Sequence, residues 1–111
     1  MTFVTVAEVG ELVDDVPLSA DVDDELTVAI VRHGGTLYAI EDECSHGNVP
    51  LSEGDVEGGT IECYLHGSRF DLATGAVLNL PATEPVRVFP VRVEGENIQV
   101  DPDSTITDFT N

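Results

Sequence analysis

Both cysteines of this 111-residue chain lie in short segments that also contain a histidine. The first segment is Cys44-Ser45-His46, and the second is Cys63-Tyr64-Leu65-His66. Thiolates and imidazoles are both good metal ligands, so each segment offers one ligand of each type. Since residues 47–62 separate the segments, the sequence predicts a metal site built by two loop tips that approach from two directions.

This even division of ligands suits a two-iron cluster in which the cysteines bind one iron and the histidines the other. Two ferric ions, two sulfides and two thiolates sum to zero charge, whereas a cluster with only cysteine ligands is negative. Because an electron enters a neutral site more easily, such centres have potentials of about −150 to +300 mV, against about −400 mV for plant-type ferredoxins.

Two other readings of the cysteines remain open from the residues alone. One is a structural zinc site of the Cys2His2 type, although zinc motifs commonly pair Cys with Cys and His with His. The other is a Cys44–Cys63 disulfide, which reducing compartments disfavour and which would leave the two histidines unexplained.

Size and composition indicate one globular domain with a mostly aliphatic core, since 41% of the residues are hydrophobic and none is Trp. No apolar run approaches the ~18 residues of a membrane span. The first residues show no basic segment followed by an apolar stretch, as an export signal would. We therefore expect a cytoplasmic protein with no membrane partner.

The charge of the chain is strongly negative, with 22 acidic residues against four arginines and a net charge of −18. Such a surface repels nucleic acid and anionic lipid, so neither is an expected partner. It fits electrostatic steering onto basic docking surfaces of redox partners. Solubility, or adaptation to a salty cytoplasm, would explain it equally well, and the sequence does not separate these readings.

Strand and turn patterns fill nearly the whole chain, which predicts an all-β fold. Residues 7–15 are the exception, with room for one helical turn through Glu11 and Leu12. Because proline cannot donate a hydrogen bond to a neighbouring strand, Pro17 predicts that the segment around it lies at a sheet edge. His33 precedes two glycines and is expected in an exposed turn without a functional role. The expected strands are Phe3–Val6, Val16–Val22, Leu26–Arg32, Thr36–Ile40, Thr60–Glu62, Arg69–Leu72, Ala76–Leu78, Val86–Val93 and Ile98–Val100.

Several segments around the two ligand boxes are together specific for one family. They are Pro50-Leu51-Ser52-Glu53-Gly54, His66-Gly67-Ser68-Arg69-Phe70-Asp71, Thr74-Gly75, Pro81-Ala82-Thr83-Glu84-Pro85 and Val91-Arg92-Val93-Glu94-Gly95. With the boxes, they resemble the Rieske ferredoxins of bacterial ring-hydroxylating dioxygenase systems. The resemblance covers about residues 3–101.

The resemblance implies an antiparallel β-sandwich-like base domain with a small cluster-binding subdomain formed by two loops. The Rieske domain would span residues 1–101, with the subdomain at about 42–82 and a loose, polar tail at 102–111. It also implies one [2Fe–2S] cluster with four ligands, a sulfide-bonding hydroxyl at Ser68 and a cluster-covering segment at Pro81. The four ligands would be Cys44, His46, Cys63 and His66.

Two features predict a potential in the lower part of the Rieske range. Phe70 stands where high-potential relatives place a tyrosine, so a hydrogen bond that raises the potential is missing. Carboxylates next to the boxes disfavour an added electron. These carboxylates belong to Glu41, Asp42, Glu43 and Glu62.

The function that the resemblance implies is that of a soluble, monomeric one-electron carrier without substrate turnover of its own. It would accept electrons from an NAD(P)H-dependent flavoprotein reductase and pass them to a terminal Rieske non-haem iron oxygenase. One alternative is a small subunit fixed in a larger redox enzyme, as in nitrite reductases. Another is an accessory role in iron–sulfur assembly.

Overall fold

The computed structural model describes residues 3–44, 49–65, 67–79, 82 and 84–104. No helix in these ranges is long and apolar enough to cross a membrane. The helices are two short 3-10 turns, η1 (Val9–Glu11) and η2 (Leu51–Glu53). The strands are β1 (Val4–Glu8), β2 (Leu18–Asp21), β3 (Thr27–His33), β4 (Thr36–Glu41), β5 (Asp55–Glu57), β6 (Thr60–Glu62), β7 (Arg69–Asp71), β8 (Val88–Phe89), β9 (Val91–Glu94) and β10 (Asn97–Val100).

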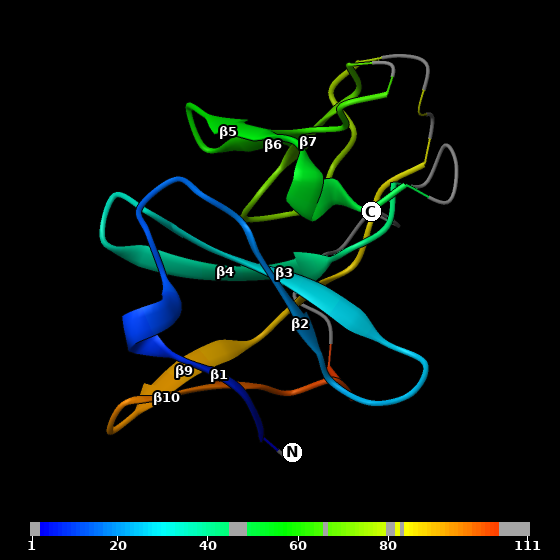
Figure 1. Cartoon of the computed structure of the whole chain (residues 1–111). Coiled ribbons are helices and arrows are strands. Elements are labelled where there is room, and N and C mark those ends of the chain that lie inside the picture. The colour runs from blue at the N-terminus through cyan, green and yellow to red at the C-terminus, as the bar shows by residue number, and fades with distance from the viewer. Residues whose placement is uncertain (1–2, 45–48, 66, 80–81, 83, 105–111) are drawn as a thin grey trace.

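These strands form three antiparallel sheets, which confirms the predicted all-β class (Figure 1). The strand order is β1-β10-β9 in the first sheet, β2-β3-β4-β8 in the second and β5-β6-β7 in the third. As predicted from Pro17, β2 is an edge strand, since it pairs only with β3. In Figure 1 the four-stranded sheet lies between the other two, and the small β5-β6-β7 sheet stands apart at the top.

The middle sheet is buried on both faces. Val28 and Ile30 of β3 point into a core shared with the β1-β10-β9 sheet, which also contains Ile98. Their neighbours Ala29 and Val31 point into a second core shared with the β5-β6-β7 sheet. Strand side chains alternate between faces, so a run of apolar residues with no exposure at all is what a central layer requires.

Paired glycines close two hairpins at equivalent places. Gly34 and Gly35 between β3 and β4 have φ angles of 59° and 80°, and Gly58 and Gly59 between β5 and β6 have φ angles of 59° and 79°. A two-residue hairpin turn with positive φ at both positions matches the right-handed twist of the strands, and glycine adopts it without steric cost. The first hairpin was predicted, whereas β5 in the second was not.

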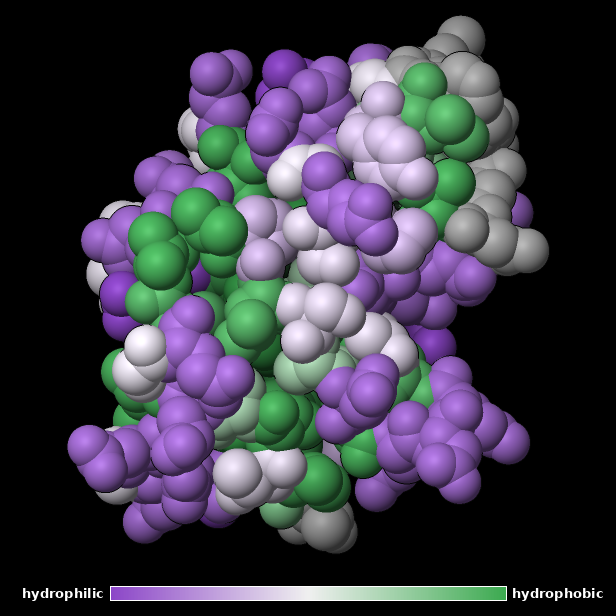
Figure 2. All heavy atoms as spheres, viewed as in Figure 1, coloured by the Kyte–Doolittle hydropathy of each residue, from purple (hydrophilic) through white to green (hydrophobic). Residues whose placement is uncertain are grey.

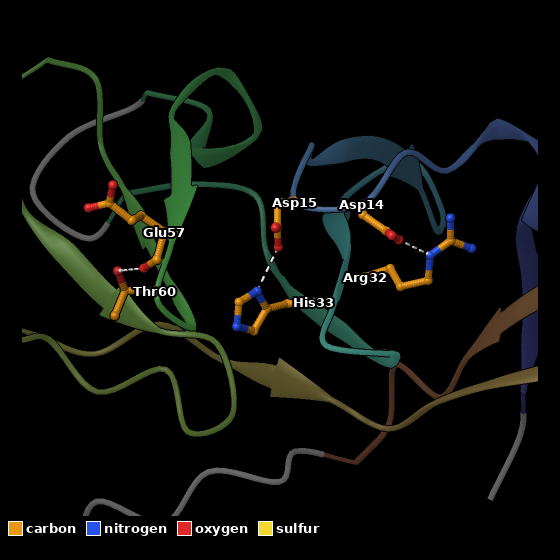
Figure 3. A network of polar contacts seen from close by, with 6 residues as sticks. All are labelled: Asp14, Asp15, Arg32, His33, Glu57 and Thr60. Atoms are coloured by element: carbon orange, nitrogen blue, oxygen red, sulfur yellow. Dashed lines mark hydrogen bonds and ion pairs between the residues drawn. The ribbon is translucent and has the colours of Figure 1, made fainter.

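The turn before β2 is fastened to the end of β3 by two acid–base pairs (Figure 3). Asp14 pairs with Arg32, and Asp15 lies 2.6 Å from the Nδ1 atom of His33. Asp15 has a positive φ of 62°, and its backbone N–H donates to the Arg32 carbonyl. His33, expected in an exposed turn, is therefore half-buried and engaged with this turn of the base.

The predicted strand Val86–Val93 is wrong as a single element. Its residues divide between β8 of the middle sheet and β9 of the β1-β10-β9 sheet, with Pro90 between them. Proline has no N–H for a ladder, so the chain crosses between layers there. Consequently Val88 of β8 is buried, whereas Val93 of β9 is 45% exposed.

Two smaller expectations also need correction. The predicted strand Ala76–Leu78 is reduced to a single bridge between Val77 and Phe70. The predicted tail does not start as a loose segment, because fully buried Asp101 accepts hydrogen bonds from the Asp103 N–H and the Ser104 hydroxyl. The rest of that tail, residues 105–111, lies outside the described residues.

Candidate metal centre

The two cysteines lie in the same core, between the middle sheet and the β5-β6-β7 sheet. Cys44 comes shortly after β4 and is 2% exposed, and Cys63 directly follows β6 and is 1% exposed. No disulfide joins them. Two buried thiols held in one core fit a shared metal site, because each thiolate there is shielded from water and from oxidation.

Both cysteine loops are closed by the same backbone pattern. The Cys44 N–H donates to the Val49 carbonyl at 2.9 Å, and the Cys63 N–H donates to the Ser68 carbonyl at 2.7 Å. The second loop has an added bond of 2.9 Å from the Gly67 N–H to the Cys63 carbonyl. Each loop therefore returns beside its own cysteine.

Gly54 lets the exit of the first loop approach the entry of the second. A Cβ atom at Gly54 would lie 1.6 Å from the carbonyl oxygen of Glu62, the residue before Cys63. No side chain fits there without moving the backbone. The close approach therefore depends on glycine, and it sets the spacing between the two loops.

Asp42 anchors the first loop to the base. Its carboxylate is nearly buried and accepts hydrogen bonds from the Ser52 N–H at 2.7 Å, the Ser52 hydroxyl at 2.8 Å and the Ser19 hydroxyl at 2.9 Å. Ser52 belongs to η2 and Ser19 to β2. One carboxylate thus joins three segments that are distant in sequence. Sequence reasoning treated Asp42 only as a nearby charge, and no local pattern reveals its partners.

Ser68 is buried, and its hydroxyl oxygen accepts a 2.9 Å hydrogen bond from the Ala82 N–H. This bond ties the segment that begins near Asn79 to the second cysteine loop. Accepting it leaves the hydroxyl hydrogen to be donated in another direction. The geometry is therefore compatible with the predicted bond from Ser68 to sulfur.

Asn79 also links its segment to the second cysteine loop, and the sequence did not predict this contact. Its side-chain amide donates to the Gly67 carbonyl at 3.0 Å, and its oxygen accepts from the Arg69 N–H at 2.7 Å. A carboxamide can make both bonds at once because it carries a donor and an acceptor. The residues on either side of Ser68 are thereby fixed by one side chain.

Arginines offset part of the negative charge near the loops. Glu41 pairs with Arg87 at 3.1 Å, and Glu62 lies 3.8 Å from Arg69. Exposed ion pairs of this type contribute little to the free energy of unfolding, yet the arginine reduces the electrostatic field of the carboxylate that it faces. These carboxylates should therefore lower the reduction potential of the cluster by less than unpaired carboxylates would.

Three of the six predicted site residues lie outside the described residues: His46, His66 and Pro81. The described part of the chain contains no cluster of three or more metal-binding side chains. Of the three that are described, Cys44 and Cys63 lie in one core, and buried Ser68 accepts the Cys63 N–H at its carbonyl.

Comparison with known proteins identifies the family. The Rieske [2Fe–2S] domain matches residues 2–90, and the chain belongs to this family. The cofactor is accordingly a Rieske-type [2Fe–2S] cluster, and the buried cysteine pair fits it. The zinc and disulfide readings are set aside.

The most similar proteins include ferredoxins of dioxygenase systems. The 3-phenylpropionate/cinnamic acid dioxygenase ferredoxin subunit of Escherichia coli (strain K12) is 48% identical over 81 residues, which cover 72% of this chain and 76% of that protein. The ferredoxin of carbazole 1,9a-dioxygenase from Nocardioides aromaticivorans IC177 superposes with a TM-score of 0.85 at 42% identity. That superposition covers 92% of this chain and 99% of the other.

A further solved structure is a complex of reduced oxygenase and oxidized ferredoxin in carbazole 1,9a-dioxygenase. The matching chain has a TM-score of 0.81 and 33% identity, and the match covers 88% of this chain and 91% of that one.

Proposed function

We propose that this protein is the Rieske ferredoxin of a ring-hydroxylating dioxygenase system. It carries single electrons from an NAD(P)H-dependent flavoprotein reductase to a terminal Rieske non-haem iron oxygenase and turns over no substrate itself. The observation that carries this proposal is the pair of buried cysteines at the bases of two equivalent loops, in a chain 48% identical to a dioxygenase ferredoxin subunit.

The ligand assignment is part of the proposal. Cys44 and Cys63 hold one iron and His46 and His66 the other, and the bound cluster supplies one reversible electron. The protein's part is to hold and shield this group. Gly54 and Asp42 fix the spacing and position of the first loop, as described above. Ser68 donates to a sulfur atom of the cluster, and the segment containing Pro81 covers it.

The oxygenase partner is supported by the related ferredoxin that was solved in complex with its oxygenase. Basic docking surfaces on both partners would suit a chain with a net charge of −18. Mutual repulsion between copies with this charge favours a monomer, and we place the protein in the cytoplasm. The domain division at about residues 42–82 within 1–101 belongs to the same proposal.

Reconstitution tests this function directly. Holoprotein is combined with a candidate reductase, a candidate oxygenase, NAD(P)H and an aromatic substrate, and hydroxylated product is measured with and without the ferredoxin. We expect product to depend on the ferredoxin at substoichiometric amounts. Tight co-purification with a larger enzyme, together with no transfer to any oxygenase, would instead favour the fixed-subunit alternative.

Ligand substitutions test the assignment. Cys44→Ser and His66→Ala should each abolish the visible absorption of the cluster and lower stability, because binding energy of the metal group is also folding energy. His33→Ala is the matched control, since His33 pairs with Asp15 in the base. Absorption spectra and iron and acid-labile sulfide analysis provide the readout, and retained colour in either ligand variant would contradict the assignment.

A further inference from the structure

Three hydrogen bonds from one later segment of the chain hold Ser68 and its two neighbours. The Ser68 hydroxyl oxygen accepts the Ala82 N–H at 2.9 Å. The Asn79 side-chain amide donates to the Gly67 carbonyl at 3.0 Å, and the Asn79 side-chain oxygen accepts from the Arg69 N–H at 2.7 Å. This segment therefore contacts Ser68 at its side chain and the backbone on both sides of it.

The two bonds of Asn79 restrain the backbone torsions of Ser68. The Gly67 carbonyl belongs to the peptide group before Ser68, and the Arg69 N–H belongs to the peptide group after it. Since peptide groups are planar, the only soft rotations between these two groups are φ and ψ of Ser68. One carboxamide that bonds to both groups thus fixes the direction in which the buried Ser68 side chain leaves the backbone.

The backbone of the later segment does not supply these two bonds. It pairs with β7 through a 2.8 Å bond from the Leu78 N–H to the Arg69 carbonyl, and the chain then bends at Asn79. The Asn79 side chain provides the donor and the acceptor that a continuing strand would provide. An alanine at this position would provide neither, because only a side chain with both groups can make both bonds.

We propose that Asn79 is a positioning residue for electron transfer, and that it sets the reduction potential by directing the Ser68 hydroxyl toward a sulfur atom of the cluster. This inference rests on the proposed function, in which Ser68 donates to that sulfur, and adds the residue that orients the donor. A hydrogen bond to sulfur raises the potential, and the bond weakens as its angle departs from linear. Releasing the backbone of Ser68 should therefore lower the potential.

Neutral substitutions suit this test, because the chain carries 22 Asp and Glu against four Arg, and hydrophilic residues are spread over the whole face shown in Figure 2. A substitution that changes a charge would move the potential through its electrostatic field alone. Asn79→Ala changes no charge. Asn97→Ala is the matched control, since Asn97 is exposed on β10, across the middle sheet from the core that contains the cysteines (Figure 1).

Protein-film voltammetry of the holoproteins measures the effect. We expect Asn79→Ala to lower the equilibrium constant for one-electron reduction about threefold, which corresponds to about 30 mV at about 59 mV per tenfold. Asn97→Ala should leave the potential unchanged. In a Ser68→Ala background, Asn79→Ala should lower the potential no further, because the hydrogen bond through which Asn79 acts is already absent.

An unchanged potential in Asn79→Ala, or the same lowering with and without the Ser68 hydroxyl, would overturn the role of Asn79, even if the variant is less stable. If Asn79→Ala does not keep its cluster, Asn79→Asp replaces it, since aspartate has nearly the same shape and keeps the acceptor for the Arg69 N–H. The added charge acts alike in both backgrounds. A larger lowering with Ser68 present therefore supports the inference, and an equal lowering overturns it.

Failure of this inference can be told apart from failure of the proposed function. Ser68→Ala at an unchanged potential would remove the proposed bond to sulfur and the role of Asn79 with it. A lowered potential in Ser68→Ala beside an unchanged one in Asn79→Ala would overturn the role of Asn79 alone. The potential is measured on this protein without partners, so failed reconstitution with an oxygenase counts only against the carrier role.

Discussion

At the scale of single residues, Ser68 combines a structural contact with a proposed electronic one. Its oxygen satisfies the buried Ala82 N–H, and its hydrogen is assigned to a sulfur of the cluster. Ser68→Ala should lower the free energy of unfolding by about 1–3 kcal/mol, because a buried donor loses its partner. It should also lower the reduction potential, since hydrogen bonds to sulfur raise it. Denaturant unfolding followed by visible absorption and protein-film voltammetry measure the two effects.

The two effects of this substitution can be told apart. Loss of stability at an unchanged potential would restrict Ser68 to its contact with Ala82 and contradict the bond to sulfur. Ser68→Thr, which keeps a hydroxyl, is the matched comparison for the potential.

Gly54 is the second residue whose identity the site requires. Gly54→Ala places a methyl group 1.6 Å from the Glu62 carbonyl oxygen, so the first loop has to move away from Cys63. We expect a loss of about 1–3 kcal/mol in stability, as for other overpacked sites, and faster loss of the cluster on heating. Gly10→Ala is the control, because a Cβ there meets nothing within 4 Å. Equal melting temperatures for the two variants would contradict the close approach.

At the scale of elements, η2 is held against the base by Asp42. Asp42→Ala removes the acceptor of the Ser52 N–H and of two hydroxyls, which should cost about 2–3 kcal/mol and loosen the segment that follows the first loop. Glu43→Ala is a matched control, since it removes the same charge from an exposed neighbour. Thermal unfolding of both holoproteins provides the measurement. Similar losses in the two variants would mean that charge, rather than hydrogen bonding, stabilises this region.

At the scale of the whole molecule, charge repulsion opposes folding. All four arginines already have contacts: Arg32 with Asp14, Arg69 with Glu62, Arg87 with Glu41, and Arg92 with the Phe3 ring and Gln99. The remaining carboxylates lie within a molecule whose radius of gyration is 12.8 Å. At 0.01 M salt the Debye length is about 30 Å, so these charges all repel one another.

Salt should therefore stabilise this protein. Raising sodium chloride from about 0.01 to 1 M shortens the Debye length to about 3 Å and should raise the melting temperature of the holoprotein by several degrees. Differential scanning calorimetry with the visible spectrum checked before each scan provides the measurement. A melting temperature that falls with salt would show that favourable ion pairs outweigh the repulsion.

Individual elements show which parts of the fold can be predicted from the sequence. The β3–β4 hairpin was predictable because paired glycines and alternating β-branched residues act locally. Strand β5 was not, since Asp55-Val56-Glu57 has little strand propensity and exists only because β6 lies beside it. The division of Val86–Val93 at Pro90 also required the structure, because proline marks an interruption without saying which sheets the two halves join.

The sequence by itself determined the all-β class, the two ligand boxes and the family, because ligand type, strand periodicity and turn residues are properties of neighbouring positions. Only the tertiary structure decided how those boxes are supported. Asp42 with Ser19 and Ser52, Ser68 with Ala82, and Gly54 against Glu62 are contacts between separate segments. Hydrogen bonds and close approaches of this kind arise when folding brings distant residues together, so no local pattern records them.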